Sequence, residues 1–247
     1  MNHFKIVIPA YNVSKWVERT IESVLIQDFK DFECVFIDDM STDNTVELVK
    51  GKIKNDQRFK IIQNTEKKYG LRNYYEGINF LKPRDNDIII TLDGDDWFPY
   101  NNVLTKVNEI YEKKQCWLTY GSYMNYPSRM KSDWIKQPSF EIVENSLFRS
   151  SDWVYSHLRT FKYGLFKRID IKDFKDMDGK WFEVSWDLAF MFPMLEMAGH
   201  KVVYLSDVLY VYNIETENND YKVRTKEVRR MDNYIRSLPK YKRINEL

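Results

Sequence analysis

The chain has 247 residues, which is enough for one large α/β domain with a substantial core and short for two independent domains. Its 38 basic and 37 acidic side chains give a net charge of +1, which excludes a general electrostatic attraction to nucleic acid or acidic membranes. Its two cysteines, Cys34 and Cys116, show neither metal-site nor disulfide spacing, and no run reaches the about 18 apolar residues that span a bilayer. The first residues also lack the apolar stretch of a secretory signal, so we expect a soluble, cytoplasmic protein.

Strand and helix patterns alternate along the first half of the chain. Short apolar runs predict buried strands at residues 4–8, 34–37, 59–62 and 88–92. Apolar residues recur at helical spacing over residues 17–25, 46–53, 74–81 and 103–110. This order predicts an α/β fold in which a doubly wound, mostly parallel sheet with right-handed crossovers is flanked by helices.

Three carboxylates follow the strand at 88–92 within four residues, at Asp93, Asp95 and Asp96. Such charges repel one another, and a hard divalent cation is the usual means of spreading them. The strand at 34–37 also ends in carboxylates, and the carboxyl ends of parallel strands are where open α/β sheets bind ligands. The alternative is a solvated acidic turn, because Asp and Gly are common turn residues.

The second half of the chain begins with a strand at 116–120 and then loses its periodicity. Residues 121–165 are rich in aromatic side chains, which suit a sugar that binds by stacking and hydrogen bonds, although such side chains also build ordinary cores. A helix is predicted from Asp187 to Ala198, and we expect Pro193 to kink or divide it. Two further strands are predicted at 201–205 and 209–213.

The C-terminal segment 222–243 carries nine basic and two acidic side chains. Its apolar residues at helical spacing predict an amphipathic helix that docks by one stripe: Val228, Met231, Ile235 and Leu238. We expect its basic face to contact an acidic membrane surface or a polyanionic acceptor, so that the protein is peripheral to a membrane. The alternative is a solvated terminal helix.

Four motifs in register carry a family resemblance. They are Ile-Pro-Ala-Tyr-Asn at 8–12, Ile-Asp-Asp-Met-Ser-Thr-Asp-Asn-Thr at 37–45, Arg72-Asn73 after Gly70, and Asp-Gly-Asp-Asp at 93–96. With these motifs the sequence resembles the family 2 glycosyltransferases of GT-A fold. The resemblance implies transfer of a sugar from a nucleotide-sugar donor, usually a uridine diphosphate (UDP) sugar, with Mn²⁺ or Mg²⁺ bound through the Asp-x-Asp segment.

The resemblance also implies a division of the chain. Residues 1–213 would form a single GT-A domain, with 1–115 as the nucleotide-sugar-binding half and 116–213 as the acceptor-binding half. Residues 214–247 would be a basic, amphipathic helical extension. The acceptor hydroxyl stays open among saccharide, lipid-linked glycan, protein and modified nucleic-acid base, with a saccharide expected first.

Four residues would frame the nucleotide base by this resemblance. Pro9, Ala10 and Tyr11 would surround it, with Tyr11 against its face, and Asp39 would accept a hydrogen bond from the pyrimidine N3–H.

Four more residues would hold the rest of the donor. Arg72 would face the base or the diphosphate, Asp93 and Gly94 would hold the ribose or donor sugar, and Asp95 would ligate the metal. A divalent cation and an arginine would both neutralise the charge that develops on a diphosphate leaving group.

The catalytic base implied by the resemblance is Asp187, at the start of the helix in the second half. Trp186 stands where the family has Glu, and Glu183 is the alternative base. A carboxylate at this position can take the proton of an attacking hydroxyl, and a single displacement inverts the anomeric centre. Asp187 could instead be only a helix cap.

Four residues are expected to touch the diphosphate or the acceptor: His157, Arg159, Glu183 and Trp186. The alternative for His157 is a structural role. The missing Glu also leaves a second function open, a nucleotide-sugar-binding module that has lost catalysis.

Overall fold

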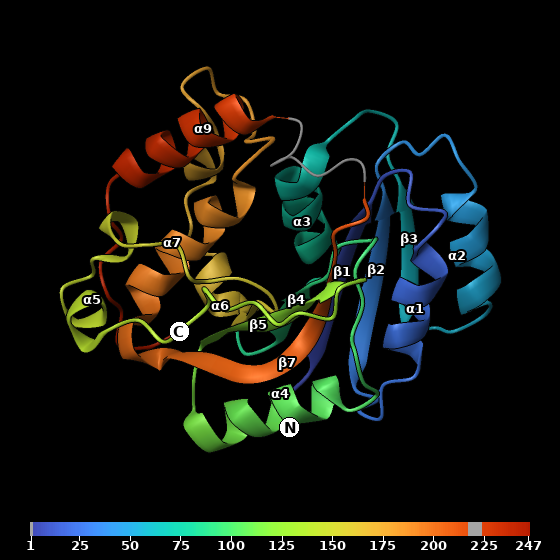
Figure 1. Cartoon of the computed structure of the whole chain (residues 1–247), viewed down its shortest axis with the longest axis horizontal. Helices are drawn as coiled ribbons and strands as arrows, with labels where there is room; N and C mark the ends of the chain where they lie inside the picture. The colour runs from blue at the N-terminus through green and yellow to red at the C-terminus, as the bar shows by residue number, and fades with distance from the viewer. Residues whose placement is uncertain (1, 217–223) are drawn as a thin grey trace.

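A seven-stranded sheet forms the centre of the protein in the computed structural model, which describes residues 2–216 and 224–247 (Figure 1). Its strand order is β3-β2-β1-β4-β6-β5-β7, and every neighbouring pair is parallel except the two that β6 makes with β4 and β5. The strands are β1 (Phe4–Ala10), β2 (Phe32–Asp38), β3 (Phe59–Gln63), β4 (Ile88–Thr91), β5 (Leu118–Tyr126), β6 (Thr160–Lys162) and β7 (Val202–Asn213). The predicted mostly parallel α/β sheet is confirmed.

Helices cover both faces of the sheet because its central strands are apolar on both sides. In β1, Ile6 and Ile8 pack on one face with α1 (Val17–Leu25), α2 (Thr45–Ile53) and α4 (Val103–Lys114). Val7 packs on the other face with α3 (Tyr69–Phe80) and α7 (Trp186–Ala198). Shorter helices complete the second face: α5 (Phe140–Glu144), α6 (Tyr163–Phe166), η1 (Phe148–Ser150), η2 (Ile171–Phe174) and η3 (Gly199–Lys201).

The loops after β2 and β4 are tied to the end of β1, so the two acidic segments meet at one edge of the sheet. The backbone N–H of Asp39 donates to the carbonyl of Ala10 at 2.8 Å, and that of Gly94 donates to the carbonyl of Pro9 at 3.1 Å. A Cβ atom at position 94 would lie 2.5 Å from the Cβ of Ala10. Only glycine therefore allows the loop after β4 to lie this close to β1.

Two predicted elements of the second half differ in the structure. The strands expected at 201–205 and 209–213 form one strand, β7. Its pairing with β5 shifts in register between Gly121 and Tyr123, and these bulges accommodate the polar residues Ser206 and Asp207 within the strand. We expected Pro193 to kink or divide its helix, and helix α7 continues through Pro193 without division. Burial of residues 188–198 offsets the loss of the hydrogen bond that proline cannot donate.

The C-terminal helix α9 (Thr225–Ser237) is shorter than the predicted 222–243 and packs against α7 (Figure 1). Val228, Met231 and Ile235 are buried, as predicted, whereas Leu238 follows the end of the helix. Lys222 lies outside the described residues.

A buried ion pair between Arg149 and Glu196 fixes the end of α9, because Arg149 also donates to the carbonyl of Ile235 at 2.6 Å. Within residues 2–216 and 224–247, no helix combines the length and the apolar character needed to cross a bilayer.

Candidate active site

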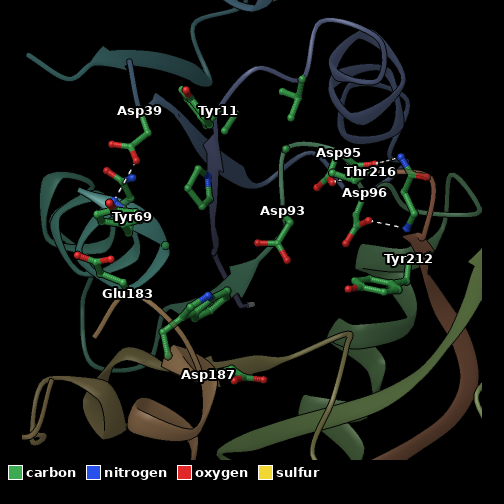
Figure 2. Close-up of a pocket in the computed structure, with 18 of the residues that line it drawn as sticks. Tyr11, Asp39, Tyr69, Asp93, Asp95, Asp96, Glu183, Asp187, Tyr212 and Thr216 are labelled. Carbon is green, nitrogen blue, oxygen red and sulfur yellow. Dashed lines mark hydrogen bonds between the residues drawn. The ribbon is translucent and has the colours of Figure 1, made fainter. Parts of the chain in front are cut away.

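A cleft of about 480 Å³ opens at the edge of the sheet where β1, β2 and β4 end (Figure 2). Its walls also include the start of α3, the segment before β6, the start of α7, the end of β7 and the start of α9. Twelve of the thirteen predicted site residues line it: Pro9, Ala10, Tyr11, Asp39, Asp93, Gly94, Asp95, His157, Arg159, Glu183, Trp186 and Asp187.

Arg72 is the predicted site residue that the structure does not bring into the cleft. Its guanidinium donates to Glu76 at 2.8 Å along α3 and pairs with Glu66 at 2.9 Å. These two carboxylates occupy the side chain, so the structure gives no support to a contact between Arg72 and the base or diphosphate.

Tyr11 and Asp39 lie together at one end of the cleft (Figure 2). Tyr11 is 39% exposed, and the Lys67 ammonium lies 2.9 Å from its ring centroid and 3.4 Å from the Asp39 carboxylate. This end therefore offers an aromatic face, a cation and a carboxylate to one ligand. Sequence reasoning missed Lys67, whose only signal was its place in a Lys-rich stretch before Gly70.

The Asp39 carboxylate is held by three hydrogen bonds. It accepts from the backbone N–H groups of Lys68 and Tyr69, both at 2.9 Å, and from the Asn64 amide at 2.8 Å. Burial would raise the pKa of Asp39, but these hydrogen bonds, led by that of Asn64, hold its pKa below the usual range. Asp39 therefore caps the start of α3 as an ionised group, and its Oδ2 also faces the Lys67 ammonium.

The three carboxylates after β4 have different partners. Asp96 accepts from the Tyr210 hydroxyl at 2.6 Å and the Asn213 backbone N–H at 2.7 Å, so it ties the loop to β7. Asp93 accepts from the Tyr74 hydroxyl at 2.7 Å, and Asp95 accepts from the hydroxyl of Thr216. Among these three residues, Asp96 thus has a donor on each of its oxygens, whereas Asp93 and Asp95 each accept from one hydroxyl of the described residues.

Burial raises the pKa of all three carboxyl groups. Burial, followed by the charge of Asp95, raises the pKa of Asp93 to about 6. Because negative charge is costly here, a cation bound at this point would be strongly favoured.

The carboxylates at this point fit a metal ion that would be held partly by the protein and partly by the phosphates of a bound substrate. Among residues 2–216 and 224–247, no group of three or more His, Cys, Asp or Glu side chains is arranged to hold a metal ion. Mg²⁺ is typically bound through one or two carboxylates together with substrate phosphates, and Asp93 and Asp95 supply that number.

Asp187, the predicted base, forms an ion pair at the far side of the cleft from Tyr11 (Figure 2). Arg159 donates to its Oδ2 at 2.6 Å, and the backbone N–H of Leu188 donates to its Oδ1 at 3.1 Å. The Arg159 side chain is only 3% exposed, whereas that of Asp187 is 20% exposed. Arg159 therefore orients a carboxylate that reaches the solvent of the cleft.

His157 contacts the Arg159–Asp187 ion pair through Arg159. Its ring stacks on those of Tyr210 and Tyr212, and its Nδ1 lies 3.4 Å from the Arg159 guanidinium. Burial, followed by the charge of Arg159, holds the pKa of His157 well below its usual range. His157 is therefore a neutral ring that faces the cleft.

The alternative base, Glu183, lies beside Tyr69 rather than beside Asp93 (Figure 2). It accepts from Arg224 of the segment before α9 at 2.8 Å. Arg224 is a second cation of the cleft that sequence reasoning missed, because nothing in the local pattern sets it apart from the other basic residues of the tail.

Trp186 stands at the position where the resemblance in the sequence led us to expect Glu. Its ring packs against Tyr74 at 5.0 Å, and a Cβ atom at position 70 would lie 2.9 Å from its indole nitrogen. The absence of a side chain at Gly70 therefore makes room for the indole beside Asp187.

The sequence matches the family Glycosyl transferase family 2 over residues 5–174. It is 26% identical over 221 residues to glycosyltransferase GlyG of Streptococcus pneumoniae serotype 4, with 84% of this chain and 69% of GlyG covered. It is 34% identical over 128 residues to WfaP of Escherichia coli, a UDP-Glc:alpha-D-GlcNAc-diphosphoundecaprenol beta-1,3-glucosyltransferase, with 51% of this chain and 47% of WfaP covered.

Solved structures share the fold. TarS 1-349 of S. aureus in complex with UDP-GlcNAc has a TM-score of 0.67 at 20% identity, with 94% of this chain and 66% of that chain covered. The mannosyltransferase PcManGT of Pyrobaculum calidifontis, in complex with GDP-Man and Mn²⁺, has a TM-score of 0.64 at 16% identity, with 96% and 65% covered. The chain thus spans less than two thirds of the length of several of these relatives and 30% of GlyA, another S. pneumoniae glycosyltransferase. The family match covers more than half of the chain, and the chain belongs to glycosyl transferase family 2.

Proposed function

We propose that this chain transfers a sugar from a nucleoside diphosphate sugar to an acceptor hydroxyl with inversion at the anomeric carbon. The observation that carries the proposal is the grouping of three features in one cleft: the Tyr11–Asp39 end, the Asp93–Asp95 pair and the ion-paired Asp187 (Figure 2). A nucleotide sugar has a base, a diphosphate and a reactive carbon in the same order.

The donor is a UDP-sugar in this proposal. Tyr11 offers a face for stacking of the base, and the ionised Asp39 carboxylate beside it is the acceptor for the N3–H of uracil. Guanine also presents a ring N–H and an amino group, and PcManGT was solved with GDP-Man, so both nucleotides belong in the binding experiment. Lys67 adds a cation beside the base.

The cofactor is Mn²⁺ or Mg²⁺, with Asp95 as the ligand from the protein and Asp93 beside it. When bound, the metal would neutralise charge on the diphosphate leaving group. Support comes from these two carboxylates, whose raised pKa values report the cost of uncompensated negative charge.

Asp187 is the general base, and Arg159 is the residue that positions it. The pair leaves the carboxylate accessible from the cleft, as an attacking hydroxyl requires. The charge of Asp187 contributes to the raised pKa of Asp93, whereas Glu183 lies beside Tyr69, which supports Asp187 as the first candidate. Attack from the side opposite the diphosphate would invert the anomeric centre.

The acceptor is a saccharide, free or attached to a carrier.

The basic face of α9 contacts an acidic membrane or a polyanionic acceptor. Three basic side chains of α9 are exposed and form no ion pair with the described residues: Lys226, Arg229 and Arg230. The division into residues 1–115, 116–213 and 214–247 also stays a prediction; Arg224 and Val228 of the last segment line the cleft.

The test compares D187N and E183Q with the unmodified protein in hydrolysis and transfer of UDP-sugars with Mn²⁺. Loss of a general base typically costs about 10²- to 10⁴-fold, so D187N should lose turnover by that factor and keep its affinity for UDP. The product anomer, read by proton NMR, should be inverted. Near-normal turnover in D187N with loss in E183Q would exchange the two roles. A chain that binds UDP without any turnover would be the catalytically degenerate binding module.

A further inference from the structure

We propose that three aromatic rings, Tyr212, Tyr123 and Trp134, form a subsite for an extended oligosaccharide acceptor that runs from the cleft to the outer surface. The proposal rests on the proposed function, since it names the class of acceptor. It implies that the acceptor is a chain of several sugars, rather than a monosaccharide or a protein side chain.

The three rings make a continuous path. Tyr212, on β7, lines the cleft below Asp96 (Figure 2). Its ring centroid lies 5.3 Å from that of Tyr123 on the neighbouring strand β5, and the Tyr123 centroid lies 6.2 Å from that of Trp134 in the following loop. The neighbouring rings are inclined to one another by 53° and 69°, so the path is a row of contacting rings rather than one flat surface.

The path begins inside the cleft and ends in solvent. Tyr212 and Tyr123 are half-buried, and Trp134 is 40% exposed. Trp134 does not itself line the cleft and connects to it through Tyr123 and Tyr212; its exposed indole offers a large apolar face and a polar N–H edge to a ligand.

The rings are held in place without a ligand. The indole N–H of Trp134 donates to the Tyr123 hydroxyl at 3.3 Å, and the neutral ring of His157 stacks on Tyr212 at 5.6 Å. Tyr123 also contacts His157 at 6.1 Å. A preorganised platform binds with a smaller loss of conformational entropy than one that must be ordered by the ligand.

The chemistry around the rings suits a sugar. Pyranose rings present apolar C–H faces that stack on aromatic rings and hydroxyl groups that need hydrogen-bonding partners. Asp133 is exposed next to Trp134 in the same loop and can supply an acceptor, and the exposed Lys131, which donates to the carbonyl of Ser206 at 2.7 Å, has further N–H donors. A flat apolar partner protein would not require charged groups between its aromatic contacts.

The experiment uses glucose, N-acetylglucosamine and galactose oligosaccharides of one to six units as acceptors, with the matching UDP-sugars and Mn²⁺. For the unmodified protein, kcat/KM should rise with acceptor length up to about three units. W134A should lower the ratio of kcat/KM for the trisaccharide to that for the monosaccharide by about tenfold, which corresponds to about 1.4 kcal/mol. F140A is the matched control, because Phe140 is 74% exposed and lies outside the path, and it should leave the ratio unchanged.

Binding of the same oligosaccharides in the presence of UDP, followed by saturation-transfer NMR, tests the subsite without turnover. Saturation transfer from the protein to protons of the second and third sugar units, reduced in W134A, would support the proposal. Equal losses for all lengths in W134A, or no oligosaccharide binding by a protein that does bind UDP and hydrolyse the donor, would overturn it. Failure of UDP binding and donor hydrolysis would instead overturn the proposed function, and the NMR result would still decide the subsite.

Discussion

Replacement of Gly94 by alanine tests how tightly the acidic loop is held against β1. A Cβ atom at position 94 would lie 2.5 Å from the Cβ of Ala10 and 3.0 Å from the carbonyl oxygen of Pro9, well inside van der Waals contact. Since β1 is buried in the centre of the sheet, the loop must move, and Asp93 and Asp95 move with it. Overpacking costs about 1–3 kcal/mol, and a shift of about 1 Å in a reactive site can cost about 100-fold in rate.

We therefore expect G94A to lose about 2 kcal/mol of unfolding free energy and about 100-fold in sugar transfer. Urea unfolding measures the first, and a UDP-release assay measures the second. Gly51 provides the control, because its added Cβ would meet no atom within 4 Å, and an alanine inside α2 should gain up to about 1 kcal/mol. If G94A unfolds and turns over like the unmodified protein, the close contact between loop and strand does not position the carboxylates.

Two further variants test the base pocket and the tail. D39N should bind UDP about tenfold more weakly and lose about 1 kcal/mol of unfolding free energy. The reason is that an amide cannot accept all of the hydrogen bonds that the carboxylate accepts. Unchanged UDP affinity by calorimetry would leave Asp39 only its role at the start of α3. Charge reversal of Lys226, Arg229 and Arg230 to Glu should abolish salt-sensitive binding to phosphatidylglycerol vesicles and to polyphosphate without lowering the melting temperature, since the three side chains are exposed. Binding that is insensitive to both the charge reversal and salt would refute a functional basic face.

The first half of the fold could be predicted because each of its elements carries a local signal. Strands that are buried on both faces appear as apolar runs, and helices between them show the 3.6-residue period. The order of these elements then specifies which strand ends share an edge, so Asp39 and Asp95 could be placed in one cleft before any coordinates.

The second half gave weaker local signals. Strand β6 has only three residues, and it pairs antiparallel between β4 and β5 inside a stretch without periodicity. The bulges that make β7 one strand depend on its pairing with β5, which is a tertiary property.

Long side chains were the least predictable part of the site. Arg72 sits in the expected motif, yet Glu66 and Glu76 draw its guanidinium away from the cleft. Lys67 and Arg224 enter the cleft although no local pattern distinguishes them from other basic residues. Sequence spacing places a Cα atom on an element, but the direction of a flexible cation depends on which carboxylates the fold brings near it.

The measurement that tests the central claim most directly is calorimetric titration of UDP into the unmodified protein and into D95A, with Mn²⁺ and with a chelator. The account predicts binding by the unmodified protein in Mn²⁺, a loss of at least about tenfold with chelator, and the same loss in D95A with the metal present. D178A, which removes an exposed carboxylate outside the cleft, should bind like the unmodified protein. UDP affinity that is equal in D95A and the unmodified protein, and equal with and without metal, would contradict a metal-assisted nucleotide-sugar site at Asp95.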